Sequence, residues 1–548
     1  RQARVGDAFK PTPEAGSFAR RQLARIAESA GPGAIAAVGG LRSSLETQAC
    51  LARLCRANGW QPPAFFGSAG LAARVHSAVA ALDPQLAVSL QEIETADAVI
   101  VVGADPLNEA PMLALALRQA LRRGAYILVA DPRPVCLPLE FRHVPLAAES
   151  LAAFLGAVVK GALSARAVEG LAELPRAFWN ALPAGADSDA AAELTDCRRP
   201  VVVCGTETVP DTLPAFAADC ARLLAVGRER SGLFYLLPGA GAFTAGRLSP
   251  PGASLEAVVD AIEADRIKAL VVTEADPLGS FPDRPRLERA LARLELLVVL
   301  DYLASATAAR AQVLLPTATI FEAGGLLVNQ EGRVQRAEPV MTGGIPVAQT
   351  GAGGHPPRDY AAGLPGGRPM PAWRLLSQLT ADPQAADADD PAACIAEVLP
   401  EAASLPAQDM RLPLYGAAGF TSSPETSTAG RPDGLALLLT QQTFGSEALS
   451  ALSPPLQALE RPPRVSLSPE SAGALGLAAG DRLVVNAAGG CFEATLTVCA
   501  QTAPGVLVVP RHRDLNWQLL GPSGSRIARA HIQRADDPHA AAPRDKRS

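Results

Sequence analysis

The chain contains 548 residues, of which 48% are hydrophobic and 19% are charged, and its formal net charge is −6. Chains of this length are organised around several hydrophobic cores, so we expect roughly three or four domains. The sequence contains neither an apolar run of membrane-spanning length nor a dense face of lysine and arginine. We therefore expect neither insertion into a membrane nor binding to nucleic acid.

Apolar strands alternate with helical patterns in the first part of the chain. A helical pattern follows the first strand, and Ser43 or Ser44 is its expected N-cap. Because these strands are apolar along their whole length, they indicate a parallel sheet with helices on both faces. The expected strands span 34–38, 98–102 and 126–129.

The same alternation returns after residue 200, with expected strands at 201–205, 269–273 and 296–300, and it contains an internal repeat. The tetrapeptide Ala-Asp-Pro-Leu occurs at 104–107 and again at 275–278, each time after an apolar strand. The next strands end at Asp131 and Asp301, 26 and 25 residues after the two loop aspartates. We therefore predict an α/β fold with two related doubly wound parallel-sheet units, whose ligands would lie at the C-terminal edges of the strands.

The pattern changes near Pro463 to short strands separated by glycine and proline turns, which is typical of a small β-barrel. Segments rich in glycine, proline and small residues at 343–367, 381–395 and 416–432 are predicted to be loops or linkers. The predicted divisions are a connecting segment at 1–30, the first α/β unit at 31–195, the second at 196–342, a linker and helical segment at 343–460, the barrel at 461–530 and a tail at 531–548.

The nine cysteines are scattered and include no C-x₂-C pair. No four of them have ferredoxin-like spacing, so we expect no iron–sulfur cluster ligated by this chain alone. Scattered thiols in a large chain indicate a reducing compartment and buried, unpaired cysteines. The chain begins with Arg1 and no signal leader follows, so we expect it to be cut from a longer protein.

Several stretches resemble motifs of the molybdopterin oxidoreductase superfamily. Residues 96–106, ADAVIVVGADP, are similar to a superfamily segment in which many catalytic members have asparagine at the position of Asp105. Residues 124–133 end in a similar Asp-Pro-Arg, and 307–336 contain the most distinctive block, Leu-Pro followed by Asn-Gln-Glu-Gly-Arg-Val-Gln. Residues 463–517 resemble the dinucleotide-binding barrel of the superfamily.

Within the superfamily, the closest resemblance is to the G subunit of NADH–quinone oxidoreductase (complex I). The Glu-Gly-Arg-Val-Gln block and the run His355-Pro356-Pro357-Arg358 before Pro371 carry this resemblance. It implies a region that looks like a molybdoenzyme but usually carries no molybdenum. It also implies iron–sulfur domains that precede this region and that are expected in a missing N-terminal part.

A catalytic member of the superfamily needs a soft metal ligand, usually cysteine, serine or selenocysteine, in the first α/β unit. We expect this ligand near 65–68, where no cysteine occurs and Ser68 is the only candidate. A serine in Gly-Ser-Ala-Gly is also typical of a turn. Cys50 and Cys55 fall inside a helical pattern, and we interpret them as packing residues.

The other candidates for a cofactor cleft each have a structural alternative. The strand-end acids Asp131 and Asp301 could accept hydrogen bonds from a nucleotide or cap the following helix. Arg333 could form an ion pair with a pyrophosphate or, within the protein, with Glu331 or Glu322. His512 either contacts the pterin, as the resemblance implies, or forms a surface pair with Arg513. The candidate cofactor-binding residues are Gly39, Gly103, Asp105, Asp131, Arg133, Asp276, Asp301, Arg333 and His512.

The first functional hypothesis is a scaffold region of the G subunit, without a catalytic residue, metal or cofactor of its own. It would support electron transfer from NADH to quinone through iron–sulfur clusters in the missing domains. It would contact other peripheral-arm subunits on the cytoplasmic side of the bacterial inner membrane. The second hypothesis is the catalytic region of a molybdopterin guanine dinucleotide enzyme such as a formate dehydrogenase, with Ser68 on the metal. A third, a stand-alone nucleotide-binding module, would require tight binding of guanine nucleotides.

Overall fold

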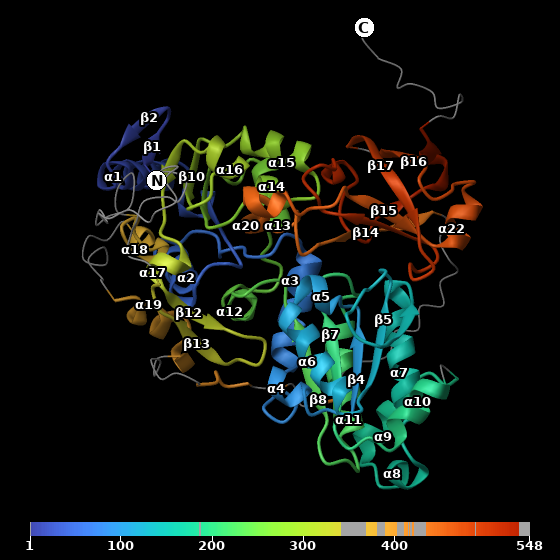
Figure 1. Ribbon diagram of the computed structural model, residues 1–548. Coiled ribbons are helices and arrows are strands. Elements are labelled where there is room, and N and C mark those ends of the chain that lie inside the picture. The colour runs from blue at the N-terminus through green and yellow to red at the C-terminus, as the bar shows by residue number, and fades with distance from the viewer. Residues whose placement is uncertain are drawn as a thin grey trace, which may run out of the picture. The chain divides into compact units, whose positions relative to one another are not determined.

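The computed structural model describes residues 2–185, 188–340, 369–380, 390–402, 410–414, 416, 419–420, 434–487 and 489–535. The chain forms two compact units, which are described separately (Figure 1). Both units are assembled from segments that are distant in the sequence. Unit 1 comprises Arg1–Val79, Gly239–Phe281 and Arg286–Pro413, and unit 2 comprises Ala80–Pro238, Pro282–Pro285 and Leu414–Ser548.

Unit 1 is built on a six-stranded mixed sheet in the order β2-β1-β11-β10-β9-β3. Strands β11, β10, β9 and β3 are parallel, and β1 pairs antiparallel with β11 at one side. Strands β3, β9 and β10 are buried along their whole length, as their continuous apolar sequence predicts. The strands are β1 (Ala3–Val5), β2 (Ala8–Lys10), β3 (Ile35–Gly39), β9 (Ala269–Thr273), β10 (Leu296–Leu300) and β11 (Val313–Leu315).

Helices of unit 1 pack on this sheet through their apolar residues. In α13, Val259 and Ile262 share a core with Val272 and Val299 of the sheet. The backbone N–H of Thr47 donates to Ser44 Oγ at 3.3 Å, so Ser44 caps α2 as expected. The helices and the hairpin are α1 (Thr12–Ala30), α2 (Leu45–Ala57), α3 (Ala69–Ala81), α12 (Ala242–Leu248), α13 (Leu255–Glu263), α14 (Pro277–Ser280), α15 (Arg284–Leu291), α16 (Ala306–Arg310), α17 (Ile320–Ala323), β12 (Gly325–Val328), β13 (Val334–Ala337), α18 (Ala372–Ser377) and α19 (Pro391–Val398).

Unit 2 contains a five-stranded parallel sheet in the order β6-β5-β4-β7-β8. In α6, Leu113 and Leu117 pack on Val99 and Val101 of β4. The strands are β4 (Ala98–Val102), β5 (Tyr126–Asp131), β6 (Arg142–Pro145), β7 (Pro200–Gly205) and β8 (Gly232–Leu236). The helices are α4 (Leu90–Ile93), α5 (Pro106–Glu109), α6 (Pro111–Arg122), α7 (Leu151–Gly161), α8 (Ala165–Glu169), α9 (Glu173–Ala181), α10 (Ser188–Thr195) and α11 (Leu213–Leu224).

The C-terminal part of unit 2 is a seven-stranded barrel-like sheet in the order β19-β14-β18-β15-β17-β16-β20. Its interior is apolar and includes Phe492 and Trp517. The strands are β14 (Leu435–Thr440), β15 (Arg464–Leu467), β16 (Arg482–Ala487), β17 (Gly490–Val498), β18 (Val506–Pro510), β19 (Arg526–Ile527) and β20 (Ile532–Arg534), and the short helices are α20 (Ala448–Ala451), α21 (Pro454–Gln457) and α22 (Pro469–Ala474).

The pairing of the strands corrects the predicted boundary between two α/β units at 195/196. Strand β3 pairs with β9, so it belongs to the sheet of unit 1, whereas β7 pairs with β4 in unit 2. Apolar strands of similar length and composition give no sequence signal for which neighbour each one chooses. The predicted segments therefore form strands and helices, but the sheets combine them in a different order.

Other boundaries also differ from the prediction. The segment 1–30 is part of unit 1, because β1 and β2 extend the sheet and α1 buries Leu23 and Ile26. Residues 391–395 begin α19, which buries Cys394, where a linker was expected. The barrel-like sheet begins at Leu435 and extends to Arg534, beyond the predicted limits of 461–530.

Some sequence predictions lie outside the described residues. These are the loop at 343–367 with His355–Arg358, the linker at 381–389, most of 416–432 and the end of the tail. Within the described part of the chain, no helix is both long and apolar enough to span a bilayer.

Candidate functional site

Two strand-end acids of the predicted site lie in different units, and each binds an arginine of its own unit. In unit 2, Asp131 ends β5 and is fully buried. Its Oδ1 accepts hydrogen bonds from the backbone N–H and Nε of Arg133, both at 2.8 Å, and its Oδ2 accepts one from Nη2 at 2.8 Å. Asp131 therefore holds a buried ion pair, which corrects the expectation that it caps a helix.

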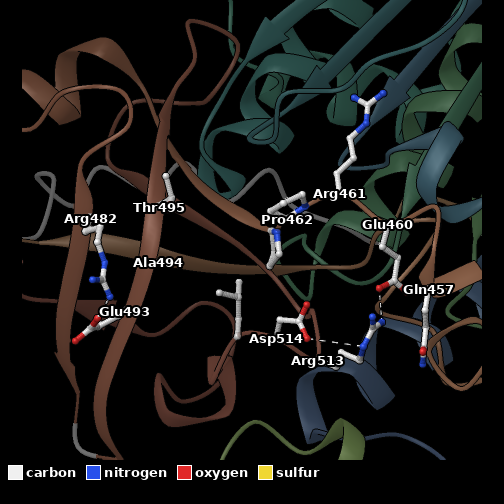
Figure 2. Close-up of a pocket in the computed structure, with 12 residues that line it drawn as sticks. Gln457, Glu460, Arg461, Pro462, Arg482, Glu493, Ala494, Thr495, Arg513 and Asp514 are labelled. Carbon is white, nitrogen blue, oxygen red and sulfur yellow. Dashed lines mark hydrogen bonds and ion pairs between the residues drawn. The ribbon is translucent and has the colours of Figure 1, made fainter. Parts of the chain in front are cut away.

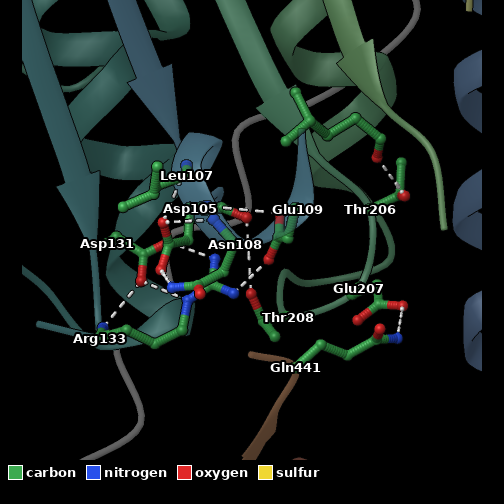
Figure 3. A network of polar contacts seen from close by, with 12 residues as sticks. Asp105, Leu107, Asn108, Glu109, Asp131, Arg133, Thr206, Glu207, Thr208 and Gln441 are labelled. Carbon is green, nitrogen blue, oxygen red and sulfur yellow. Dashed lines mark hydrogen bonds and ion pairs between the residues drawn. The ribbon is translucent and has the colours of Figure 1, made fainter. Parts of the chain in front are cut away.

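Further carboxyl groups gather around the Arg133 guanidinium (Figure 3). Glu109, at the end of α5, forms an ion pair with Arg133. Asp105 caps α5 by accepting hydrogen bonds from the backbone N–H groups of Leu107 at 3.2 Å and Asn108 at 3.3 Å. The short helix α5, which begins within the Ala-Asp-Pro-Leu sequence, thus brings Asp105 and Glu109 close to Asp131.

The cluster in unit 2 carries an excess of negative charge. Burial raises the pKa of Glu109 to about 7, Arg133 opposes this rise, and the charge of Glu207 adds to it. Glu207 itself accepts a hydrogen bond from Gln441 Nε2 at 3.2 Å. The carboxyl groups of Asp105, Glu109 and Asp131 thus surround one guanidinium, and the charge of Glu207 acts on Glu109 from nearby. Such a cluster repels an anion such as a diphosphate.

In unit 1, the corresponding acid Asp301 ends β10 and binds Arg42. The Nη2 atom of Arg42 donates to Asp301 Oδ1 at 2.9 Å and to Oδ2 at 2.7 Å. The same guanidinium lies 4.5 Å from the ring centre of Tyr302. Burial raises the pKa of Asp301, and Arg42 opposes that rise. Asp301 is therefore also held by an internal cation, and not by the N-terminus of a helix.

Glu274 follows β9 directly and is the second acid of this cluster. It is buried and has a left-handed backbone conformation, with φ of 48°. Burial raises its pKa to about 7, although Arg42 lowers it. The hydroxyl groups of Ser43, Thr273 and Thr317 are buried in this region without a hydrogen bond of ordinary geometry. These polar atoms have capacity to bind water or a polar ligand.

The candidate metal ligand Ser68 has a structural role at the start of α3. Its Oγ accepts a hydrogen bond from the backbone N–H of Leu71 at 3.2 Å, as an N-cap does. Cys50 and Cys55 are buried in α2, as their helical pattern predicts. Among the described residues, no group of three or more His, Cys, Asp or Glu side chains could hold a metal ion.

The predicted glycines are needed for packing within their own units. A Cβ atom on Gly39 would lie 2.3 Å from Cε1 of Phe65. Gly103 has φ of 63°, and a Cβ atom there would lie 2.1 Å from Cγ1 of Val209. These close approaches explain both glycines without a bound ligand.

The remaining predicted residues of unit 1 also have protein partners. Asp276 accepts hydrogen bonds from the backbone N–H of Thr307 at 3.2 Å and from its Oγ1 at 2.6 Å. Arg333 donates from Nε to Glu331 Oε1 at 3.1 Å, which is one of the two internal partners proposed for it. Glu322 instead closes a capping box at α17.

His512 lies beside a polar cavity of about 470 Å³ in unit 2 (Figure 2). It is 1% exposed, which corrects the alternative that it forms a surface pair with Arg513. Its Nδ1 accepts a hydrogen bond from the backbone N–H of Asp514 at 3.2 Å, and its Nε2 lies 3.4 Å from Glu460 Oε2. The cavity is lined by Gln457, Glu460, Arg461, Pro462, Pro463, Arg482, Glu493, Ala494, Thr495, Arg513, Asp514 and Leu515.

Sequence reasoning missed four charged residues that shape these clusters: Arg42, Glu109, Glu207 and Glu274. Each of them lies within a few residues of the C-terminal end of a parallel strand, namely β3, β4, β7 or β9. This position was the available signal, because ligands and polar clusters of α/β folds lie at that edge. The positions of the strand-end acids alone do not identify their cationic partners.

A family model for molybdopterin oxidoreductases matches residues 13–344, which is more than half of the chain, and the chain belongs to this family.

The relatives include G subunits of NADH-quinone oxidoreductases. That of Pseudomonas putida is 32% identical over 329 residues, covering 55% of this chain and 35% of that protein. That of Shewanella oneidensis is 32% identical over 269 residues, covering 45% and 29% respectively. The alpha subunit of the NADPH-Fe(3+) oxidoreductase of Geobacter sulfurreducens is 27% identical, covering 52% and 32%. The chain spans about a third of the length of these relatives.

The fold is also similar to that of a solved enzyme, the acetylene hydratase from Pelobacter acetylenicus. The TM-score is 0.64 with 14% sequence identity, and the similarity covers 93% of this chain and 84% of that one. This likeness concerns the fold alone.

The family implies a molybdopterin cofactor, and the side chains of the two clusters fit it poorly. The guanidinium groups of Arg42 and Arg133, which could pair with a diphosphate, are bound by buried carboxylates. The cluster around Arg133 has excess negative charge, and Ser68 is engaged as a helix cap. Arg133 and Ser68 therefore do not supply the free cation and the metal ligand that a metal-bound pterin dinucleotide needs, whereas Arg42 retains a buried Nη1 without a hydrogen bond.

Proposed function

We propose that the chain is a structural region of a NADH–quinone oxidoreductase G subunit. In this role, it supports electron transfer through iron–sulfur clusters carried by preceding domains and contacts other subunits of the peripheral arm. The complex would lie at the cytoplasmic side of a bacterial inner membrane. The observation that carries the proposal is the internal neutralisation of Arg42 and Arg133, because carboxylates of the chain already balance the positive charge that each guanidinium could offer to a dinucleotide. The G-subunit relatives support the choice of complex.

Metal and pterin analysis of the purified full-length protein tests this proposal. The protein should be isolated from cells grown with molybdate and tungstate, so that neither metal is limiting. We expect far less than one molybdenum or tungsten atom per chain and no fluorescent pterin on acid release. Stoichiometric metal together with pterin would overturn the scaffold role.

A matched pair of variants in the assembled oxidoreductase tests the role itself. Ser68→Ala removes the only candidate metal ligand near the expected position, and we expect unchanged NADH–quinone activity. Arg133→Met disrupts the buried cluster, and we expect less assembled complex but unchanged activity per assembled complex. Loss of activity in Ser68→Ala without loss of assembly would contradict the proposal.

A second candidate function is the catalytic region of a molybdopterin guanine dinucleotide enzyme. The observation that favours it is the set of buried hydroxyl groups near Glu274, on Ser43, Thr273 and Thr317, which lack well-formed hydrogen bonds. A polar ligand at the ends of β3, β9 and β11 would satisfy them. The same metal and pterin analysis distinguishes the two functions.

A further inference from the structure

Two buried cysteines meet where α19 packs against α2 in unit 1. Cys50 is 3% exposed and Cys394 is 2% exposed. Their helices pack against each other, and the two side chains are close enough for each thiol to shift the pKa of the other. Neither cysteine forms a disulfide in the structure. Two thiols from distant parts of the sequence are thus buried together between α2 and α19.

A cation makes the two thiols chemically different. Arg53 lies three residues after Cys50, so both side chains share one face of α2. Its Nη1 donates to Cys394 Sγ at 3.6 Å, while its Nε donates to Glu397 Oε2 of α19 at 2.6 Å. The guanidinium therefore contacts the sulfur of Cys394 and is itself held by a carboxylate one turn further along α19.

The electrostatics favour a thiolate on Cys394 and a neutral thiol on Cys50. The hydrogen bond from Cys50 lowers the pKa of Cys394 to about 6, burial opposes this shift, and Arg53 adds to it. The same hydrogen bond and burial raise the pKa of Cys50. A thiolate beside a neutral thiol is the arrangement of a reactive dithiol, because the thiolate is the nucleophile.

Other buried cysteines of the chain provide a contrast. Cys204 and Cys220 are fully buried in unit 2, and burial raises the pKa of both. Cys55, on the same helix as Cys50, also has a pKa raised by burial, to about 12. Burial alone thus keeps a thiol protonated and inert in this protein, and the interaction with Cys50 together with the contact with Arg53 distinguishes Cys394.

We propose that Cys50 and Cys394 are a redox-active pair that a hydroperoxide oxidises to a disulfide between α2 and α19. With hydrogen peroxide, the Cys394 thiolate attacks one oxygen, the O–O bond breaks, and Cys394 becomes a sulfenic acid while hydroxide leaves into the solvent. The Cys50 sulfur then attacks the Cys394 sulfur, and the S–S bond forms as the S–O bond breaks. The departing hydroxide takes the proton of the Cys50 thiol and leaves as water. The dithiol loses two electrons and the peroxide gains them.

The disulfide would link α19 covalently to α2, a helix that contacts several other elements of unit 1. On α2, the Glu46 carboxylate accepts hydrogen bonds from the backbone N–H of Leu326 in β12, at 3.0 Å to each oxygen. The side chain of Gln48 donates to the carbonyl of Gly241 at 3.1 Å. A covalent bond at Cys50 would therefore join α19 to a helix that already holds β12 and the start of α12.

Peroxide treatment of the full native chain tests the proposal. After exposure to hydrogen peroxide, free thiols are blocked with N-ethylmaleimide and the protein is mapped by mass spectrometry without reduction. We expect a disulfide between the peptides of Cys50 and Cys394, while Cys204 and Cys220 remain free thiols. If Cys50 and Cys394 stay reduced while the exposed Cys136 and Cys491 are oxidised, the proposal is wrong.

Two variants separate the effect of the cation from that of the ion pair. Arg53→Gln and Glu397→Gln both break the Arg53–Glu397 contact, but only the first removes the cation from Cys394. We expect Arg53→Gln to slow disulfide formation at pH 5, below the pKa of Cys394, by up to about tenfold, because one unit of pKa changes the thiolate fraction there by up to tenfold. Glu397→Gln should keep or increase the rate, since Glu397 raises the pKa of Cys394. Equal slowing in both variants would refute activation by Arg53.

Discussion

Replacing Arg133 with methionine should destabilise unit 2 by about 3–5 kcal/mol, the usual effect of removing one partner of a buried ion pair. Methionine keeps much of the apolar volume of the side chain but removes its charge. Asp131 is 0% exposed and would lose the two guanidinium hydrogen bonds that it accepts at 2.8 Å. Glu109 would lose its ion pair, and the carboxyl groups of the cluster would then repel one another without a counterion.

Calorimetry and hydrogen exchange can measure this loss. A destabilisation of this size should lower the melting temperature of unit 2 by roughly 6–20 °C, at about 2–4 °C per kcal/mol for domains of a few hundred residues. Amides of β4 and β5 should exchange faster, while those of β9 and β10 in unit 1 serve as an internal reference. Arg482→Met is the matched control, because Arg482 and Glu493 form an exposed pair that contributes at most about 1 kcal/mol. If both variants changed stability equally, the cluster around Arg133 would not be a buried ion-pair network.

The other predictions concern unit 1. The pKa of Glu274 is about 7 in the folded chain and about 4.3 in unfolded peptides, so the stability that its protonated form contributes is present below about pH 4 and is lost as the pH rises through 7. In urea unfolding, the stability of Glu274→Gln relative to the native chain should therefore be greater at pH 8 than at pH 5. If the two proteins had the same pH dependence, the raised pKa of Glu274 would be wrong. Gly40→Ala should destabilise the chain by roughly 1–3 kcal/mol or more, because the new Cβ would lie 1.8 Å from the carbonyl oxygen of Glu274. Gly67→Ala is the control: its Cβ would meet no atom within 4 Å, so its stability in the same assay should be nearly unchanged. Ser68→Ala should lower stability by about 1 kcal/mol through loss of a helix cap, and rescue by Ser68→Asp, a good capping residue, would separate capping from metal binding.

The sequence alone located the central strands accurately. The expected strands at 98–102, 269–273 and 296–300 agree with β4, β9 and β10 residue for residue. Their continuous apolar character and the polar residues that follow them were sufficient, because both are local properties of the chain. The barrel was found for the same reason, although its first strand, β14, precedes the expected start.

The partners of the candidate residues could not be found in this way. Asp131 and Arg133 are two residues apart, so their ion pair could have been inferred from the local sequence. Arg42 and Asp301 come together only because β3 pairs with β9 and β9 pairs with β10. That pairing depends on tertiary contacts that periodicity does not encode. The pairing of Arg53 with Cys394 is hidden for the same reason, since it requires α19 to pack on α2.

The pairing of β3 with β9 also constrains how the chain can fold as it is synthesised. Ile35 of β3 can pair with Ala269 of β9 only after Ala269 has been synthesised, and the whole segment from Ala80 to Pro238 is synthesised in between. Until β9 emerges, β3 has an exposed apolar edge, and such edges favour aggregation. The five-stranded sheet of unit 2 has all of its strands between Ala98 and Leu236, so it can form first. Unit 1, whose strands flank that segment, closes late, and its assembly is the step at which a chaperone would be of most use.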